Sequence, residues 1–169
     1  DFALKYIVDA WGGSLSFDTQ FTFQDEATTA LFEDTVRDNN GEFGEPEWVG
    51  RLWTNDDHGN WSYYWGIDFI GDVSNVKDFG GDTTTYRGET VRVVIDADWV
   101  MYNSFSVTRH FTQKGVRATL GIRNAFDEEP PRVTTLSLGQ LNTAGNSAFY
   151  SQYDYLGQRF FLSVAWDFF

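Results

Sequence analysis

Residues 14–24 read SLSFDTQFTFQ, and their side chains alternate between apolar and polar. The odd positions carry Leu15, Phe17, Thr19, Phe21 and Phe23, whereas the even positions carry only Ser, Asp, Gln and Thr. Successive side chains of a β-strand point to opposite faces of its sheet. The pattern therefore predicts a strand with one apolar and one polar face.

The same alternation recurs along the chain and predicts about seven strands, at residues 2–9, 14–24, 48–55, 61–72, 91–107, 116–123 and 160–168. Most of these runs extend over about ten residues. Strands of soluble domains average about five or six residues, whereas a tilted membrane strand needs roughly 9–11. We find no convincing amphipathic helix, so the sequence predicts an all-β chain.

The connections between these strands alternate strictly between short and long. The long ones are residues 25–47, 74–90 and 127–157, and an up-and-down meander places all of them at one end. Aromatic residues gather near the short-turn end: Trp11, Trp61, Phe111, Trp166, Phe168 and Phe169. Together these features predict an antiparallel up-and-down transmembrane β-barrel segment. Its lipid-facing side chains are expected to be Phe21, Phe23, Trp65, Ile67, Trp99, Leu120, Leu162 and Val164.

Charge and composition exclude several classes of function. The chain has 25 acidic and 12 basic residues, a net charge of −13, which is not the footprint of a nucleic-acid-binding protein. It has no cysteine and two histidines, so disulfides and thiol nucleophiles are ruled out within it. The three long connections hold 15 of the acidic residues, which favours a solvated surface. Attraction of cationic ligands and bridging by Ca²⁺ are the functional alternatives.

Two acidic groups could suggest catalysis, but neither is convincing. Asp56, Asp57 and His58 are expected in a short turn beside Gly59, where such residues are common for turn geometry alone. Asp96 and Asp98 are expected on one face near the middle of a strand, where they would line a wet lumen. We therefore expect no enzymatic activity and no cofactor.

Residues 121–131 read GIRNAFDEEPP and combine a strand end with strand-breaking residues. Asn124 and Asp127 have short polar side chains that can satisfy the backbone groups freed where a strand ends. Pro130 and Pro131 cannot donate to a β-ladder and would stop the strand there.

This string resembles the late-barrel motif of TonB-dependent outer-membrane receptors, in which Asn124, Phe126, Asp127, Pro130 and Pro131 are the matching residues. Residues 155–168, YLGQRFFLSVAWDF, resemble the closing strand of the same family, with Trp166 and Phe168 near its end. Residues 44–48, GEPEW, also resemble the start of a strand seen there. One departure is Phe169, because the family usually ends on the phenylalanine that Phe168 matches.

The resemblance implies part of a transporter that imports a scarce nutrient through a plugged barrel of about 22 strands. It implies contacts with membrane lipid, with a plug and with TonB, and a closing strand read by the barrel-assembly machinery. The long connections would be extracellular and the last strand would end in the periplasm.

About seven strands are too few to close even the smallest barrel, of about eight. We therefore expect residues 1–169 to form the C-terminal part of a larger barrel domain, whose plug and N-terminal strands lie outside this chain. Two alternatives remain open: a soluble acidic, Trp-rich β-domain that binds carbohydrate, and a piece of a passive porin.

Overall fold

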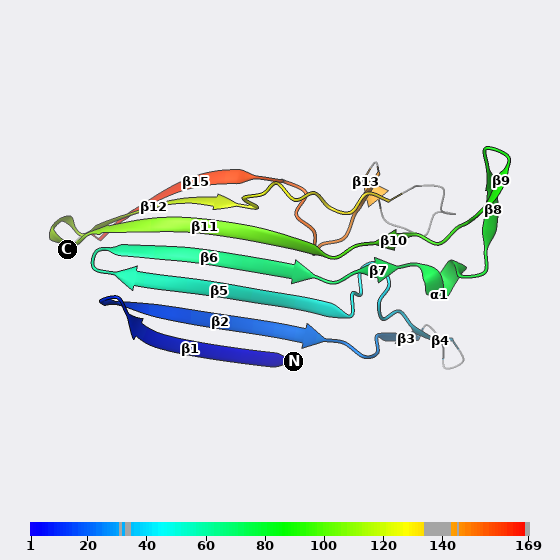
Figure 1. The fold of residues 1–169 in the computed structure, drawn as a ribbon, viewed down its shortest axis with the longest axis horizontal. Helices are drawn as coiled ribbons and strands as arrows, with labels where there is room; N and C mark the ends of the chain where they lie inside the picture. Colours follow the sequence, from blue (N-terminus) through cyan, green and yellow to red (C-terminus); the bar gives the residue numbers. More distant parts are fainter. Residues whose placement is uncertain (31, 33–34, 134–142, 145, 168–169) are drawn as a thin grey trace.

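The structure is a computed structural model that describes residues 1–169 apart from 31, 33–34, 134–142, 145 and 168–169. Its main feature is one large antiparallel sheet (Figure 1). In spatial order the strands are β1 (Phe2–Ala10), β2 (Gly13–Phe23), β5 (Trp48–His58), β6 (Trp61–Ile70), β11 (Val100–Phe111), β12 (Val116–Arg123) and β15 (Arg159–Trp166). The spatial order follows the chain order, so the sheet is an up-and-down meander.

The prediction of an all-β chain with a large antiparallel sheet is confirmed. The seven strands of this sheet have 8 to 12 residues each. Among the described residues, β1 and β15 form the two edges of the sheet and each pairs on one side only. Closure into a barrel, and the total number of its strands, therefore remain predictions.

Two of the predicted strand boundaries are wrong. The run at residues 91–107 is divided among β9 (Glu89–Arg92), β10 (Asp96–Ala97) and β11. Between these pieces the backbone bonds elsewhere, because the Val93 amide donates to the Asp82 carbonyl and the Ile95 amide to the Asn75 side chain. Residues 56–58, expected in a turn, instead continue β5: Asp56 and Asp57 pair with both β2 and β6, and His58 pairs with β6.

The turn between β1 and β2 shows how short the connections at one end are. Ala10 pairs with Gly13, which leaves only Trp11 and Gly12 between the strands. Both have positive φ angles, 51° and 81°. A two-residue turn with positive φ at both positions matches the right-handed twist of the flanking strands.

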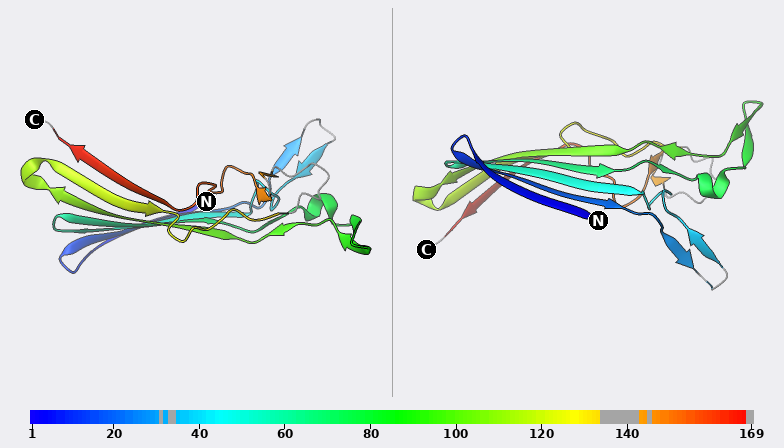
Figure 2. Two further views of the ribbon diagram at one scale, coloured as in Figure 1. Left: turned by 90° about the horizontal axis from the view of Figure 1, so that it is seen from above. Right: turned by 60° about the horizontal axis from the view of Figure 1, so that its bottom comes forward.

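The long connections carry small elements of their own, and all of them leave the sheet at the other end (Figure 2). They contain the hairpins β3–β4 and β8–β9, the pairs β7–β10 and β13–β14, and the single-turn helix α1. The bounds not yet given are β3 (Thr28–Ala30), β4 (Val36–Asp38), β7 (Val73–Ser74), α1 (Val76–Phe79), β8 (Thr83–Tyr86), β13 (Thr143–Ala144) and β14 (Ser147–Ala148). No helix in the described residues is long and apolar enough to cross a membrane.

The buried core lies at this same long-connection end. It joins side chains of the sheet, such as Ile70 and Tyr102, to Phe43, Val133 and Tyr153 from two of the long connections. Strand parity puts Ile70 and Tyr102 on the polar face of the sheet. The core residues of these two connections therefore pack on the polar face.

Candidate functional site

One face of the sheet, here called the apolar face, carries a continuous apolar surface. The register places Leu120 between Val107 and Leu162, and Trp65 beside Phe105. The predicted shared face of Phe21, Phe23, Trp65, Ile67, Leu120, Leu162 and Val164 is confirmed by this register. Leu162 is 71% exposed and Leu120 56%, far more than a protein core allows.

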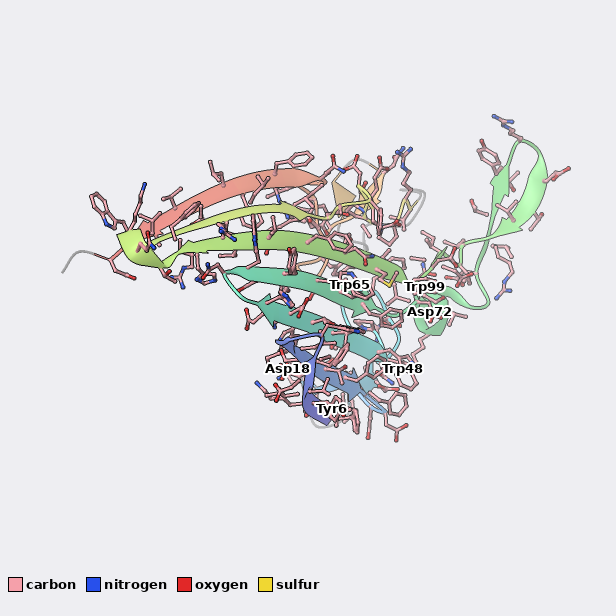
Figure 3. The ribbon with its side chains drawn as sticks, turned by 60° about the vertical axis from the view of Figure 1, so that its left-hand side comes forward. Tyr6, Asp18, Trp48, Trp65, Asp72 and Trp99 are labelled. Carbon is pink, nitrogen blue, oxygen red and sulfur yellow. The ribbon has the colours of Figure 1, made fainter. Side chains whose placement is uncertain are left out.

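A row of aromatic rings crosses the apolar face near the long-connection end and is called here the upper aromatic row. It consists of Phe21, Phe23, Trp48, Phe69 and Trp99. Neighbouring ring centroids lie 4.5–6.1 Å apart, within the usual range for aromatic pairs. Figure 3 labels Trp48 on β5, Trp65 on the adjacent β6, and Trp99 just before β11.

A second row, the lower aromatic row, lies near the short turns and consists of Trp11, Trp61, Phe111 and Trp166. The Arg109 guanidinium lies over the Trp61 ring, 4.5 Å from its centroid, and 5.9 Å from that of Phe111. Tryptophan and arginine with an apolar body and a polar end suit a membrane–water boundary.

The distance between the two rows fits a bilayer. On β11, Met101 pairs with Phe69 of the upper row, and Phe111 of the lower row follows ten residues later. Ten residues of strand span about 33 Å, which at a tilt of ~40° corresponds to ~25 Å along the membrane normal. This is the height of the apolar band of an outer-membrane barrel.

The opposite face, here called the polar face, carries ionic and hydroxyl side chains on the same strands. Lys5 pairs with Asp18 across β1 and β2, and Arg51 pairs with Asp68 across β5 and β6. These pairs are solvent-exposed and contribute little stability each. Their placement matters more, because both ion pairs lie on the polar face, whereas Asp56 and Arg109 on the apolar face lie near the short turns. The polar face therefore requires water or protein on its side.

The polar face also borders an open cavity of about 980 Å³ below the segment 151–154. Its basic lining residues are Arg51, Arg123 and Arg159, and its acidic ones are Asp68 and Asp154. Both carboxylates are paired, since Arg159 binds Asp154 through two nitrogens at 2.9 Å and 2.7 Å, and Arg51 binds Asp68.

Two glycines of the polar face make room for aromatic rings beside this cavity. A Cβ added to Gly66 would lie 2.2 Å from the Tyr64 hydroxyl, and one added to Gly121 would lie 2.3 Å from the Phe161 ring. Tyr64 and Phe161 therefore lie along the sheet over Gly66 and Gly121, where an added Cβ would require the ring to move.

Asn124 and Asp127 form a clamp at the end of β12, in which Asn124 closes the turn after the strand and Asp127 joins that turn to Gln158, the residue before β15. Asn124 is 1% exposed, and its side chain accepts from the Glu128 amide at 2.9 Å and donates to the Glu128 carbonyl at 2.8 Å. Asp127 Oδ1 accepts from the Gln158 amide at 2.8 Å. These bonds give a local physical role to two residues that the sequence singles out by their type at a strand end, and that also match the family motif.

The other motif residues lie apart from this clamp. Phe126 is exposed and packs edge-on against Phe105, and Trp166 ends β15 in the lower aromatic row. The Pro131 carbonyl accepts from the Ala148 amide at 2.9 Å, and Pro130 is half-buried beside it. Phe168 lies outside the described residues.

The acidic groups considered as catalytic candidates are not brought together. Asp56 and His58 lie on the apolar face and Asp57 on the polar face, because all three are strand residues. Asp96 belongs to β10 and accepts from Ser74 Oγ at 2.6 Å, so its expected mid-strand position is wrong. In the part of the chain that the structure describes, no group of three metal-ligating side chains is found.

The two largest pKa shifts among the described residues lie at the long-connection end. The Lys77 ammonium, followed by the Ala27 and Asn40 amides, lowers the pKa of Asp38 to about 2. Burial raises the pKa of Tyr153 to about 12. These groups hold the connections together and do not converge on a reactive centre.

Sequence reasoning missed the upper aromatic row and the arginines of the cavity. Trp48 and Phe69 lie near the ends of predicted strands and could have indicated the upper row, whereas Trp99 lies in the middle of the predicted strand 91–107. The cavity had no such signal, because it depends on the register of β12 with β15 across a long connection. No family model, characterised protein or solved structure matches this chain.

Proposed function

We propose that this chain forms part of the wall of a TonB-dependent outer-membrane transporter, which imports a scarce nutrient through a plugged barrel. The carrying observation is that the apolar face is uncovered and bounded by two aromatic rows, while the core and the cavity lie on the polar face. A soluble sheet would bury its apolar face instead.

The edges of the sheet support a larger barrel. Each strand of a membrane-embedded sheet must pair on both sides, because unpaired backbone groups in hydrocarbon cost several kcal/mol each. Strands β1 and β15 pair on one side only among the described residues. In this proposal their outer edges bind further strands of the barrel, and the polar face meets a plug.

The proposed TonB dependence rests on the resemblance of residues 121–131 and 155–168 to that family. The same resemblance implies TonB and the barrel-assembly machinery as partners. The connections that carry Phe43 and Tyr153 are then extracellular, and β15 ends in the periplasm. A carbohydrate-binding soluble domain is less favoured, because Trp65 and Leu120 share one exposed face that is rich in Leu, Val and Phe.

The membrane part is tested by cysteine scanning of β15, since the chain contains no cysteine. Four single variants of the native protein are compared: Leu162→Cys and Val164→Cys on the apolar face, and their neighbours Ser163→Cys and Ala165→Cys. Each variant is labelled with a fluorophore in bilayers that contain nitroxide lipids. We expect strong quenching at 162 and 164 and weak quenching at 163 and 165. Equal quenching at all four positions contradicts the proposal.

The transport part is tested in cells that produce or lack the protein, each with and without TonB. All four strains receive one defined nutrient mixture, and solute depletion is measured by mass spectrometry. We expect at least one solute to be depleted only when both proteins are present. Depletion that is independent of TonB indicates a passive pore instead.

A further inference from the structure

Arg123 and Arg159 lie directly opposite each other on β12 and β15. Like charges in directly opposite positions of an antiparallel pair are destabilising. Asp154 neutralises Arg159 through two hydrogen bonds. Arg123 is exposed, and its guanidinium carbon lies 5.7 Å from the centroid of the Phe161 ring. Among the described residues, Arg123 forms no ion pair.

The cavity beside this arginine pair is positively charged in a strongly acidic chain. Its three arginines exceed its two aspartates by one, although the chain as a whole has a net charge of −13. The acids of the long connections lie outside it, apart from Asp154. An excess arginine in a recess is suited to bind an anion, because its planar group can donate two parallel hydrogen bonds to a carboxylate.

The cavity also offers flat apolar surface. Tyr64 and Phe161 lie along the sheet over Gly66 and Gly121, and Trp53 lines the same space. A volume of about 980 Å³ is that of a small-molecule site. Aromatic faces next to an arginine favour a ligand that has both a planar apolar part and a negative charge.

We propose that this cavity binds a small organic anion that carries carboxylate groups on a planar, apolar framework. Arg123 forms the primary ion contact and the rings of Tyr64 and Phe161 hold the planar part. This inference rests on the proposed function, because it names the class of solute that would bind in the upper part of the barrel lumen.

The test uses phthalate, a rigid aromatic dicarboxylate, and phthalamide, a neutral compound of similar size and shape. Binding of each to the purified native protein in a non-ionic detergent is measured by calorimetry. We expect phthalate to bind at least about tenfold more tightly than phthalamide, and its affinity to fall with rising salt. Equal binding of the two compounds, or no binding of phthalate, overturns the proposal. This comparison uses the unmodified protein and needs no substitution.

The residue assignment is tested with Arg123→Gln, and with Arg117→Gln as its matched control. Arg117 lies on the same strand and the same face, six residues nearer the short-turn end, and does not line the cavity. We expect phthalate binding to weaken about tenfold in Arg123→Gln and to change less than about twofold in Arg117→Gln. Equal losses in the two variants contradict the assignment.

This result can be separated from the membrane proposal. The calorimetry requires neither transport nor TonB, whereas the cysteine scan of β15 requires no ligand. Alternating lipid quenching together with no phthalate binding would contradict only the proposed anion site. Phthalate binding together with equal quenching on both faces of β15 would contradict the proposed membrane location and would still support the cavity as a ligand site.

Discussion

Asn124 and Glu128 form a closed ring of two hydrogen bonds, in which the Asn124 amide both donates to and accepts from the Glu128 backbone. Asn124 also has a φ of 46°, a conformation that asparagine tolerates better than most residues. The residue therefore ends β12 through its side chain and its backbone together.

Replacing Asn124 by Ala should lower the free energy of unfolding by about 2–4 kcal/mol, because it removes two buried hydrogen bonds and strains the positive φ. Asn124→Gly keeps the backbone unstrained and should cost ~1 kcal/mol less. Urea unfolding of the native protein measures both. Gln113→Ala, at an exposed position after β11, is the control. A loss in Gln113→Ala equal to that in Asn124→Ala would contradict the clamp.

Replacing Leu120 by Arg should lower the free energy of unfolding in a bilayer by about 2–4 kcal/mol, the cost of a charge on the lipid face near the midplane. Its neighbour Thr119 points to the other face and bonds Thr108 at 2.8 Å. Thr119→Arg should therefore cost about 1 kcal/mol, from that one hydrogen bond. Similar losses at 119 and 120 would argue against a lipid-facing apolar side.

Strand parity was enough to predict which side chains share a face, because the alternation of apolar and polar residues with a period of two can be observed in the sequence itself. Leu120 and Leu162 are 42 residues apart, yet parity assigned them to one face, and the register pairs them. Parity failed at residues 91–107, where the alternation continues but the backbone turns away to bond Asn75 and Asp82. Those hydrogen bonds depend on tertiary contacts that no local pattern encodes.

The candidate site was less predictable than the fold. Asn124 and Asp127 were found because their residue types suit a strand end. The opposition of Arg123 and Arg159 could not be found, because the connection between β12 and β15 is too long to fix their register from the sequence. The small core around Tyr102 and Tyr153 was missed for the same reason.

A Cβ on Gly50 would lie 2.5 Å from the Phe21 ring, which Trp48 and Phe69 hold from either side. Gly50→Ala should therefore lower the free energy of unfolding by about 1–3 kcal/mol through overpacking. In a Phe21→Ala background the same change should cost much less, and the double-mutant cycle measures this coupling. Gly81→Ala is the control, because nothing lies within 4 Å of its Cβ position. Additive effects of Gly50→Ala and Phe21→Ala would contradict this packing.

A contact between Asp38 of β4 and Lys77 of α1 joins two of the long connections. Lys77 Nζ donates to Asp38 Oδ2 at 2.6 Å, and the Ala27 and Asn40 amides donate to Oδ1. These bonds favour the carboxylate and lower the pKa of Asp38 from 3.8 to about 2. Because the folded-state pKa is the lower one, the stabilising effect is complete above the unfolded-state value of 3.8 and is lost as the pH falls toward 2.

Carbon-13 NMR of the Asp38 carboxyl group in the native protein measures this titration directly. Lys77→Met should raise the pKa of Asp38, because it removes the largest of the three interactions and leaves the two amide bonds. Arg87→Met is the matched control, because Arg87 lies in the β8–β9 turn over the Tyr86 ring. This substitution removes one positive charge, as Lys77→Met does, but removes no contact with Asp38. If both variants shift the titration equally, net charge and not the Lys77 hydrogen bond sets the pKa of Asp38.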